Sequence, residues 1–407
     1  MRRENEPPSV KPRIAIIADA IAGGWGGSEE LWSQAAKRLV SKGVSVAASV
    51  HGRFPLHDRV WDLKRSGVEL WLRPERYSLW RRLPRRVVSG RKSDLLIEIE
   101  KFLSLVQPEL VVFTAGGIVS PIEWLELCQR KGLRFVTIGQ GNYECWWPHD
   151  ETAARYRQAL HAALRCYFVS RANLRLVEKQ IGAELCNAEV VRNPFNIDFN
   201  TSLHWPSPAE NGEIRLACVG RLDPRSKGQD LLLEALAAPG WKSRPWRLIL
   251  YGNGPIKDGI KRLVQRLGLD GRVTLAGHIS RIEDIWAENH VLVMPSRCEG
   301  LPLAMVEAML CGRPVVATDV AGQSEIVEDG VSGFLADAPT VTSVGRTLER
   351  LWSRRNDLRM MGQAAAESIR TKVPADPAKV FAEKIEGLLS CNHLVGTVIR
   401  RKSNSAC

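Results

Sequence analysis

The chain has 407 residues and a formal net charge of +12, and 25% of its residues are charged and 44% hydrophobic. This length leaves room for two ordinary α/β domains, and the composition is that of a soluble globular protein. No apolar run approaches the length of a membrane span. The nine cysteines are scattered singly, without a Cys-x-x-Cys pair, which favours reduced thiols in a cytosolic protein over disulfides or a zinc site.

Strands and helices are expected to alternate after a polar lead-in at 1–12, which has no apolar signal-peptide core. Residues 13–19 and 44–50 are predicted as buried strands, joined by a glycine-rich loop at 21–27 and a helix that Ser28 caps. The glycines of this loop do not follow the G-x-G-x-x-G spacing of a dinucleotide site. The loop can still offer backbone N–H groups to a phosphate.

The first domain is predicted to span residues 13–200 and to contain one doubly wound parallel sheet. Its later strands are expected at 109–114, 133–138, 166–170 and 190–191. The loop at 139–150 is rich in aromatic and polar residues, which is unusual for a simple connection.

A basic cluster lies between Arg73 and Lys92, where eight cations accompany a single acid, Glu75. It is either a solvated basic face or an attachment site for anionic lipid, to which each basic residue contributes about 1 kcal/mol. The second interpretation places the protein in the cytoplasm, peripherally on the inner face of the membrane. The arginines assigned to that contact are Arg73, Arg76, Arg81, Arg82, Arg85 and Arg86. No recognised nucleic-acid-binding motif accompanies the charge, so nucleic acid is not an expected partner.

A Pro- and Ser-bearing polar stretch at 201–212 is predicted as the linker to a second doubly wound domain at 213–370. Its strands are expected at 214–220, 247–251, 273–276, 291–294, 314–318 and 334–335. A last helix is predicted at 376–390, and residues 391–407 are expected to form a basic, disordered tail.

Two carboxylates frame the helix predicted at about 302–310. Glu299 lies in the loop after a buried strand, at the strand end where open α/β sheets bind ligands. Glu307 is the only charge in a helix of Leu, Ala, Met and Val. A buried carboxylate without a partner is very costly, so Glu307 needs either an Arg or Lys or the hydroxyl groups of a ligand. Gly300 permits close approach, and the free N–H groups at the helix start would face an anion.

This region, CEGLPLAMVEAMLCGRPVVATDVAGQSEIVEDGVSGFLA from 298 to 336, resembles the donor-site signature of the retaining family 4 glycosyltransferases. The resemblance implies the GT-B fold, in which two doubly wound domains face each other across a cleft. It also implies that Glu299 contacts the transferred sugar and Glu307 the nucleotide ribose. In proteins of that fold the last helix, here 376–390, often packs back across the first domain.

The resemblance extends to shorter motifs on both sides of the expected cleft. On the donor side it implies contacts from Gly220, Gly252, Asn253, Gly254, Gly277, His278, Gly300, Leu301 and Pro302. On the acceptor side the corresponding residues are Gly26, Gly27, Ser28, Glu29, Gln140, Asn142 and His149. Many family members carry a histidine where this chain has Gln140, and His149 is a candidate local substitute. Glu325, in a G-x-x-E-I segment, is expected to cap a helix.

Two cations complete the predicted site. Arg221 and Lys227 lie where a strand ends and a helix begins, at the same sheet end as Glu299. If they face the cleft, they can hold a nucleotide diphosphate and stabilise the charge that develops as the glycosyl bond breaks. Family members commonly separate the two by five positions and this chain by six, so Arg225 competes with Lys227 for the role. Without Asp-x-Asp or a metal-ligand spacing, these cations are expected to act without a metal.

The resemblance therefore implies a retaining glycosyltransferase that moves a sugar from a nucleotide-sugar donor to a glycan or lipid-linked acceptor, and the residues themselves favour a metal-independent reaction. The nucleotide-sugar is a substrate, and no cofactor is expected. Catalysis would consist of positioning and electrostatics in a closing cleft, without a protein nucleophile. The alternative is a non-catalytic protein of the same fold that binds a nucleotide-sugar or glycan. A two-domain nicotinamide dehydrogenase is disfavoured by the missing G-x-G-x-x-G.

Overall fold

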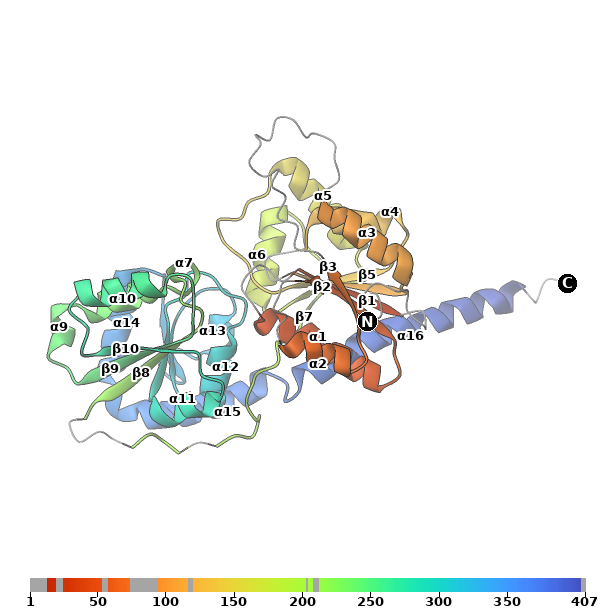
Figure 1. Cartoon of the computed structure of the whole chain (residues 1–407). Helices are drawn as coiled ribbons and strands as arrows, with labels where there is room; N and C mark the ends of the chain where they lie inside the picture. The colour runs from red at the N-terminus through yellow and green to blue at the C-terminus, as the bar shows by residue number, and fades with distance from the viewer. Residues whose placement is uncertain are drawn as a thin grey trace.

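The computed structural model describes residues 13–19, 25–52, 58–73, 94–115, 120–202, 204–207 and 212–403, and for 391–403 it describes the backbone alone. These residues form two α/β units that lie side by side, each built around its own parallel sheet (Figure 1).

The first sheet has seven parallel strands in the order β3-β2-β1-β4-β5-β6-β7. They are β1 (Ile14–Asp19), β2 (Val46–His51), β3 (Glu69–Arg73), β4 (Leu110–Ala115), β5 (Phe135–Gly139), β6 (Arg165–Phe168) and β7 (Ala188–Val190). The helices of this unit are α1 (Gly27–Ser41), α2 (Asp58–Arg65), α3 (Asp94–Val106), α4 (Ile122–Arg130), α5 (Asp150–Ala162) and α6 (Arg171–Ile181). Ile14 and Ile16 of β1 lie in one core cluster and Ala15 and Ile17 in another, because successive strand side chains point to opposite faces. Both faces of the sheet are therefore covered.

The second sheet has six parallel strands in the order β10-β9-β8-β11-β12-β13. They are β8 (Ile214–Val219), β9 (Trp246–Tyr251), β10 (Val273–Gly277), β11 (Val291–Met294), β12 (Val315–Thr318) and β13 (Gly333–Ala336). Its helices are α7 (Pro224–Lys227), α8 (Gln229–Leu236), α9 (Pro239–Lys242), α10 (Lys257–Arg266), α11 (Ile282–Glu288), α12 (Leu303–Leu310), α13 (Gln323–Ile326), α14 (Val341–Ser353) and α15 (Leu358–Lys372). The predicted fold of two doubly wound parallel sheets is confirmed.

The strand orders place the functional loops. In the second sheet the chain runs outward from β8 to one edge through β9 and β10, and then to the other edge through β11. Open α/β sheets bind ligands beyond the carboxyl ends of the strands at such a reversal. The loops that follow β8 and β11 are those that carry Lys227 and Glu299.

The predicted membrane contact of Arg73 is wrong. Arg73 ends β3, an edge strand that the sequence prediction missed, and its side chain is buried. Its guanidinium donates to the backbone oxygens of Ser49 and Ala18 and to the Ser49 hydroxyl. These acceptors hold the charge inside the protein, away from any lipid. The other arginines of the cluster, Arg76, Arg81, Arg82, Arg85 and Arg86, lie outside the described residues.

Two helix ends also differ from the prediction. Helix α1 begins at Gly27, not after a Ser28 cap, and its N-terminus is closed by Glu29, whose carboxylate accepts the Gly26 N–H at 2.9 Å. At the other end of the chain, α16 (Pro377–Ser403) continues well past 390, so residues 391–403 are helical where a disordered tail was expected.

After α15 the chain returns to the first unit, where helix α16 runs along α1 (Figure 1). Phe381, Ile385 and Leu389 enter the first unit's core, where Phe381 meets Tyr167 edge-on at 5.2 Å. Ion pairs such as Lys42–Glu386, at 2.6 Å, line its edge. The chain passes between the units a first time near residue 195, earlier than the expected linker, because Phe195, Ile197 and Phe199 pack in the second core. In the part of the chain that is described, every helix is too short or too polar to span a bilayer.

Candidate functional site

The loop after β8 is folded back onto the loop after β11. Gly228, at the end of α7, has φ +65°, and a Cβ there would lie 1.9 Å from the Pro295 oxygen. Only glycine permits this approach, and it brings Lys227 beside Glu299.

Lys227 and Glu299 form an ion pair, with 2.5 Å between Nζ and Oε1. The Ser296 hydroxyl donates to the same Oε1 at 2.8 Å. The side chains are 23% and 8% exposed, so the pair is open to the cavity mainly on the lysine side. Two residues separated by 72 positions thus meet where the sequence predicted them to meet.

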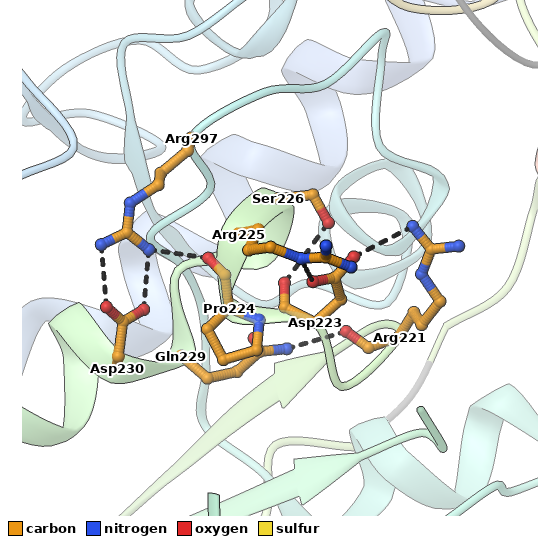
Figure 2. A network of polar contacts seen from close by, with 8 residues as sticks. All are labelled: Arg221, Asp223, Pro224, Arg225, Ser226, Gln229, Asp230 and Arg297. Atoms are coloured by element: carbon orange, nitrogen blue, oxygen red, sulfur yellow. Dashed lines mark hydrogen bonds and ion pairs between the residues drawn. The ribbon is translucent and has the colours of Figure 1, made fainter. Parts of the chain in front are cut away.

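Asp223 organises the arginines of the same loop (Figure 2). Its buried carboxylate accepts from Arg221 at 3.3 Å and from Arg225 at 3.1 Å. Arg221 lines the cavity described below, whereas the Arg225 side chain is 79% exposed and does not line it. The structure therefore favours Lys227 over Arg225 as the second cation of the site.

An ion pair between Arg297 and Asp230 holds α7 in position (Figure 2). The sequence did not single out either residue. Arg297 makes a two-pronged ion pair with Asp230, at 2.7 and 2.8 Å, and also donates to the Pro224 oxygen at 2.7 Å. The Asp230 carboxylate raises the pKa of Arg297. These bonds fix the short helix that carries Lys227.

The first unit contributes the opposite wall. The segment from Gln140 to Tyr143 follows β5 and, with the loops after β8 and β11, encloses a cavity of about 160 Å³. A Cβ on Gly300 would lie 2.0 Å from the Gln140 oxygen, so the two units touch backbone to backbone here. The lining residues are Gln140, Gly141, Asn142, Tyr143, Arg221, Ser226, Lys227, Cys298, Glu299 and Gly300.

Gln140 and Asn142 are both buried and hydrogen-bonded. The Gln140 amide donates to the Ser28 oxygen at 3.3 Å and accepts from Asn193 at 2.8 Å. His149, the suggested substitute for the family histidine, is exposed at the start of α5 and does not line the cavity.

Glu307 lies in α12 and is buried, as its apolar helix predicted. Its carboxylate accepts the Asn196 backbone N–H at 3.0 Å and the Asn196 side-chain amide at 3.2 Å. No Lys or Arg among the described residues forms an ion pair with it. Burial raises the pKa of Glu307, and the bonds from Asn196 oppose that rise. Glu307 does not line the cavity.

The other predicted contacts lie around this centre. Gly26, Gly27 and Ser28 form the start of α1, and Gly27 lies against Leu303 of α12. Glu29 is buried, and burial raises its pKa.

The loops after β9 and β10 lie next to the Arg221 loop. The Asn253 oxygen accepts from the Leu222 N–H at 3.0 Å, and the Gly277 oxygen accepts from the Gly252 N–H at 2.7 Å. His278 is exposed, and Leu301 and Pro302 are buried at the start of α12. None of these residues, nor Gly220 and Gly254, lines the cavity.

Glu325 joins the two units. It caps a helix, as expected, but that helix belongs to the other unit: its carboxylate accepts the Ala172 N–H of α6 at 2.9 Å. Its second oxygen pairs with Arg192 at 2.9 Å. Among the described residues, no group of three or more His, Cys, Asp or Glu side chains could hold a metal ion.

Residues 213–354 match the family model described as Glycosyl transferases group 1. The alpha-D-kanosaminyltransferase of Streptomyces kanamyceticus is 32% identical over 135 residues, which are 33% of this chain and 35% of that protein. The D-inositol 3-phosphate glycosyltransferase of Gordonia bronchialis is 31% identical over 205 residues, 45% of this chain and 43% of that protein. The chain thus matches less than half the length of each relative.

Solved structures match over nearly the whole chain. HepE of Anabaena, in complex with UDP, has a TM-score of 0.68 at 19% identity, and covers 92% of this chain and 100% of its own. Sucrose-phosphate synthase of Thermosynechococcus elongatus has a TM-score of 0.69 at 17% identity, with 93% and 100% covered. These likenesses confirm the predicted two-domain GT-B fold.

Proposed function

We propose that this chain is a member of the glycosyl transferases group 1 family, whose model matches residues 213–354, and that it transfers a sugar from a nucleotide-sugar donor to an acceptor hydroxyl. The observation that carries the proposal is the Lys227–Glu299 ion pair, which shares a cavity between the two domains with Arg221. Cations at the carboxyl ends of parallel strands suit a diphosphate, which is the part common to such donors.

Binding of a donor would rearrange the ion pair. A diphosphate that enters between Arg221 and Lys227 takes over Lys227 as its counter-ion. Glu299 is then free to accept hydrogen bonds from hydroxyl groups of the sugar. The negative charge that develops on the departing diphosphate is stabilised by the same two cations.

We propose that the reaction proceeds with retention of configuration. The bond between the sugar anomeric carbon and the diphosphate oxygen breaks, and the acceptor oxygen bonds to that carbon on the same face. The acceptor proton passes to an oxygen of the leaving diphosphate, so no protein nucleophile is required. Glu307, held by Asn196, is assigned to the nucleotide ribose.

The acceptor is proposed to be a glycan or a lipid-linked glycan, as in polysaccharide biosynthesis. The protein would act in the cytoplasm at the membrane surface, held by the arginines at 76, 81, 82, 85 and 86, with Arg73 excluded by its burial. Cosedimentation with phosphatidylserine vesicles tests this contact. Neutralising those five arginines should abolish cosedimentation, and unchanged binding would refute the membrane contact.

The test of the function is a panel of UDP-, GDP- and ADP-sugars, measured for binding by calorimetry and for donor hydrolysis and transfer by product analysis. We expect donors of one nucleotide class to bind. When an acceptor is added, the nucleoside diphosphate should be released and the transferred sugar should keep its anomeric configuration. Binding without turnover under any acceptor condition would favour the non-catalytic alternative. If the protein binds none of these donors, the proposal is refuted.

A further inference from the structure

Tyr143 is a cavity residue that the proposed function leaves without a role. It belongs to the first domain, its side chain is 44% exposed, and it lines the cavity together with Arg221 and Lys227. Its hydroxyl interacts with the Cys298 thiol, which belongs to the opposite, second-domain wall.

Buried amides fix the backbone of Tyr143. The Tyr143 backbone N–H donates to the Asn142 side-chain oxygen at 2.7 Å. The Tyr143 backbone carbonyl oxygen accepts from the Gln180 side-chain amide at 2.8 Å. Asn142 and Gln180 also bond each other at 2.8 Å, and both are 4% exposed. Burial of two amides is unfavourable unless they are satisfied, so this network specifies one conformation. It directs a single partly exposed phenol into the cavity.

The partner of the phenol is a weak one. A thiol sulfur accepts hydrogen bonds poorly, whereas a phosphate oxygen is a strong, charged acceptor. Burial raises the pKa of Tyr143, so its hydroxyl keeps its proton at neutral pH. Burial also raises the pKa of Cys298 to about 11, so the thiol stays neutral and does not compete as a thiolate.

We propose that Tyr143 is a further substrate-contacting residue, whose hydroxyl exchanges the Cys298 thiol for an oxygen of the donor diphosphate, across the cavity from Arg221 and Lys227. The inference rests on the proposed function and deepens it, because it adds a neutral donor from the first domain to the two cations of the second. The diphosphate would then be held from both walls, and its binding would draw the domains together.

The test compares nucleoside diphosphates with their parent nucleosides. UDP, GDP and ADP are first titrated into the full-length protein by calorimetry, and the tightest is compared with its nucleoside in each variant. Tyr143→Phe keeps the ring and removes the hydroxyl. We expect it to weaken the binding of the nucleoside diphosphate about 10- to 100-fold, as for the loss of one hydrogen bond to a charged group, and to leave the affinity for the nucleoside unchanged.

Trp147→Phe is the matched control, because Trp147 is a 57% exposed aromatic residue of the same loop that does not line the cavity. It should leave both affinities unchanged. Gln180→Met alone should weaken diphosphate binding. Added to Tyr143→Phe it should weaken binding no further, since Gln180 acts through Tyr143. Cys298→Ala removes the competing acceptor and should strengthen diphosphate binding.

The outcomes separate this inference from the function beneath it. If Tyr143→Phe binds the diphosphate as tightly as the wild type, Tyr143 is no phosphate ligand, while the proposed function stands. If Cys298→Ala weakens the diphosphate as much as Tyr143→Phe does, the pair is a structural contact between domains and the inference fails. If the wild-type protein binds no nucleoside diphosphate, the proposed function and this inference fall together.

Discussion

The two walls of the cavity differ in chemistry. The second-domain wall carries the charged groups Arg221, Lys227 and Glu299, on loops that the Arg297–Asp230 and Asp223 contacts make rigid. The first-domain wall presents the neutral side chains of Gln140 and Tyr143. The charged wall lies within residues 213–354, which match the family model, and the neutral wall lies outside them.

This difference suggests a division of labour. UDP-, GDP- and ADP-sugars all carry a diphosphate, so the wall that holds it can be the same for many donors. Sugars and acceptors differ in their hydroxyl groups, which a neutral amide such as that of Gln140 recognises by direction. We therefore expect changes in the charged wall to abolish turnover and changes at Gln140 to redirect it, whereas Tyr143 is the neutral residue assigned to the diphosphate.

The largest effect is expected at Lys227. Lys227→Met should lower turnover about 100- to 1000-fold, because a preorganised group that stabilises the leaving charge is lost. Transfer of a radiolabelled donor sugar measures it. Arg225→Met is the control and should retain nearly full activity, since that side chain is 79% exposed and outside the cavity. Equal losses in both variants would contradict the assignment of Lys227.

The next largest effect is expected for the Arg192–Glu325 ion pair, which joins the two domains. Arg192→Ala removes the ion pair to Glu325 and a 2.7 Å bond to the Val169 oxygen. We expect unfolding in urea to lose about 2 kcal/mol, as for bonds that involve a charged group. Arg165→Ala, at an exposed residue of the same domain, should change stability by less than about 0.5 kcal/mol. A loss as small for Arg192 would mean that this contact does not hold the domains together.

A smaller effect is expected at Gln140, on the neutral wall. Gln140→Ala should reduce transfer about tenfold relative to donor hydrolysis, because one positioning contact of about 1.4 kcal/mol is lost, and should change donor affinity less. The ratio of transferred to hydrolysed sugar is the measurement. A uniform loss of donor affinity would place Gln140 with the charged wall instead.

The smallest effect concerns the stability of the charged domain. Burial raises the pKa of Glu307 above its ordinary value of 4.5, so the folded state holds the proton more tightly than the unfolded state. This contribution is fully favourable at low pH and is lost as pH rises above 4.5. Glu307→Gln keeps an acceptor for Asn196 without the charge. The stability of this variant relative to wild type, measured by urea unfolding, should be higher at about pH 8 than at about pH 5. A constant difference would show that Glu307 is not buried as a carboxylate.

The sequence predicted the two sheets and the Lys227–Glu299 meeting because both follow from local rules. Buried strands have continuous apolar runs, and the carboxyl ends of neighbouring parallel strands converge. Strand β3 was not predicted because its residues are mostly half-buried at a sheet edge. An arginine is usually a surface residue, and Arg73 is buried only because the backbone oxygens of Ser49 and Ala18 accept its hydrogen bonds.

The partners across the domains could not be predicted. Ala172 as the partner of Glu325 depends on how two separately folded units meet, and Asn196 as the partner of Glu307 depends on where the chain first crosses between them; no local pattern encodes either. Tyr143 was missed for a related reason. Its loop was noted as aromatic, but only the buried Asn142–Gln180 network distinguishes the ring that enters the cavity from Trp147, which does not.

Helix α16 has a consequence for biosynthesis. Phe381, Ile385 and Leu389 complete the core of the first domain, although the whole second sheet and its helices, from β8 to α15, separate them from β7. On the ribosome, the second domain emerges whole and can fold while the amino-terminal half still exposes the apolar surface that α16 will cover. The core of the half that is translated first is therefore completed last.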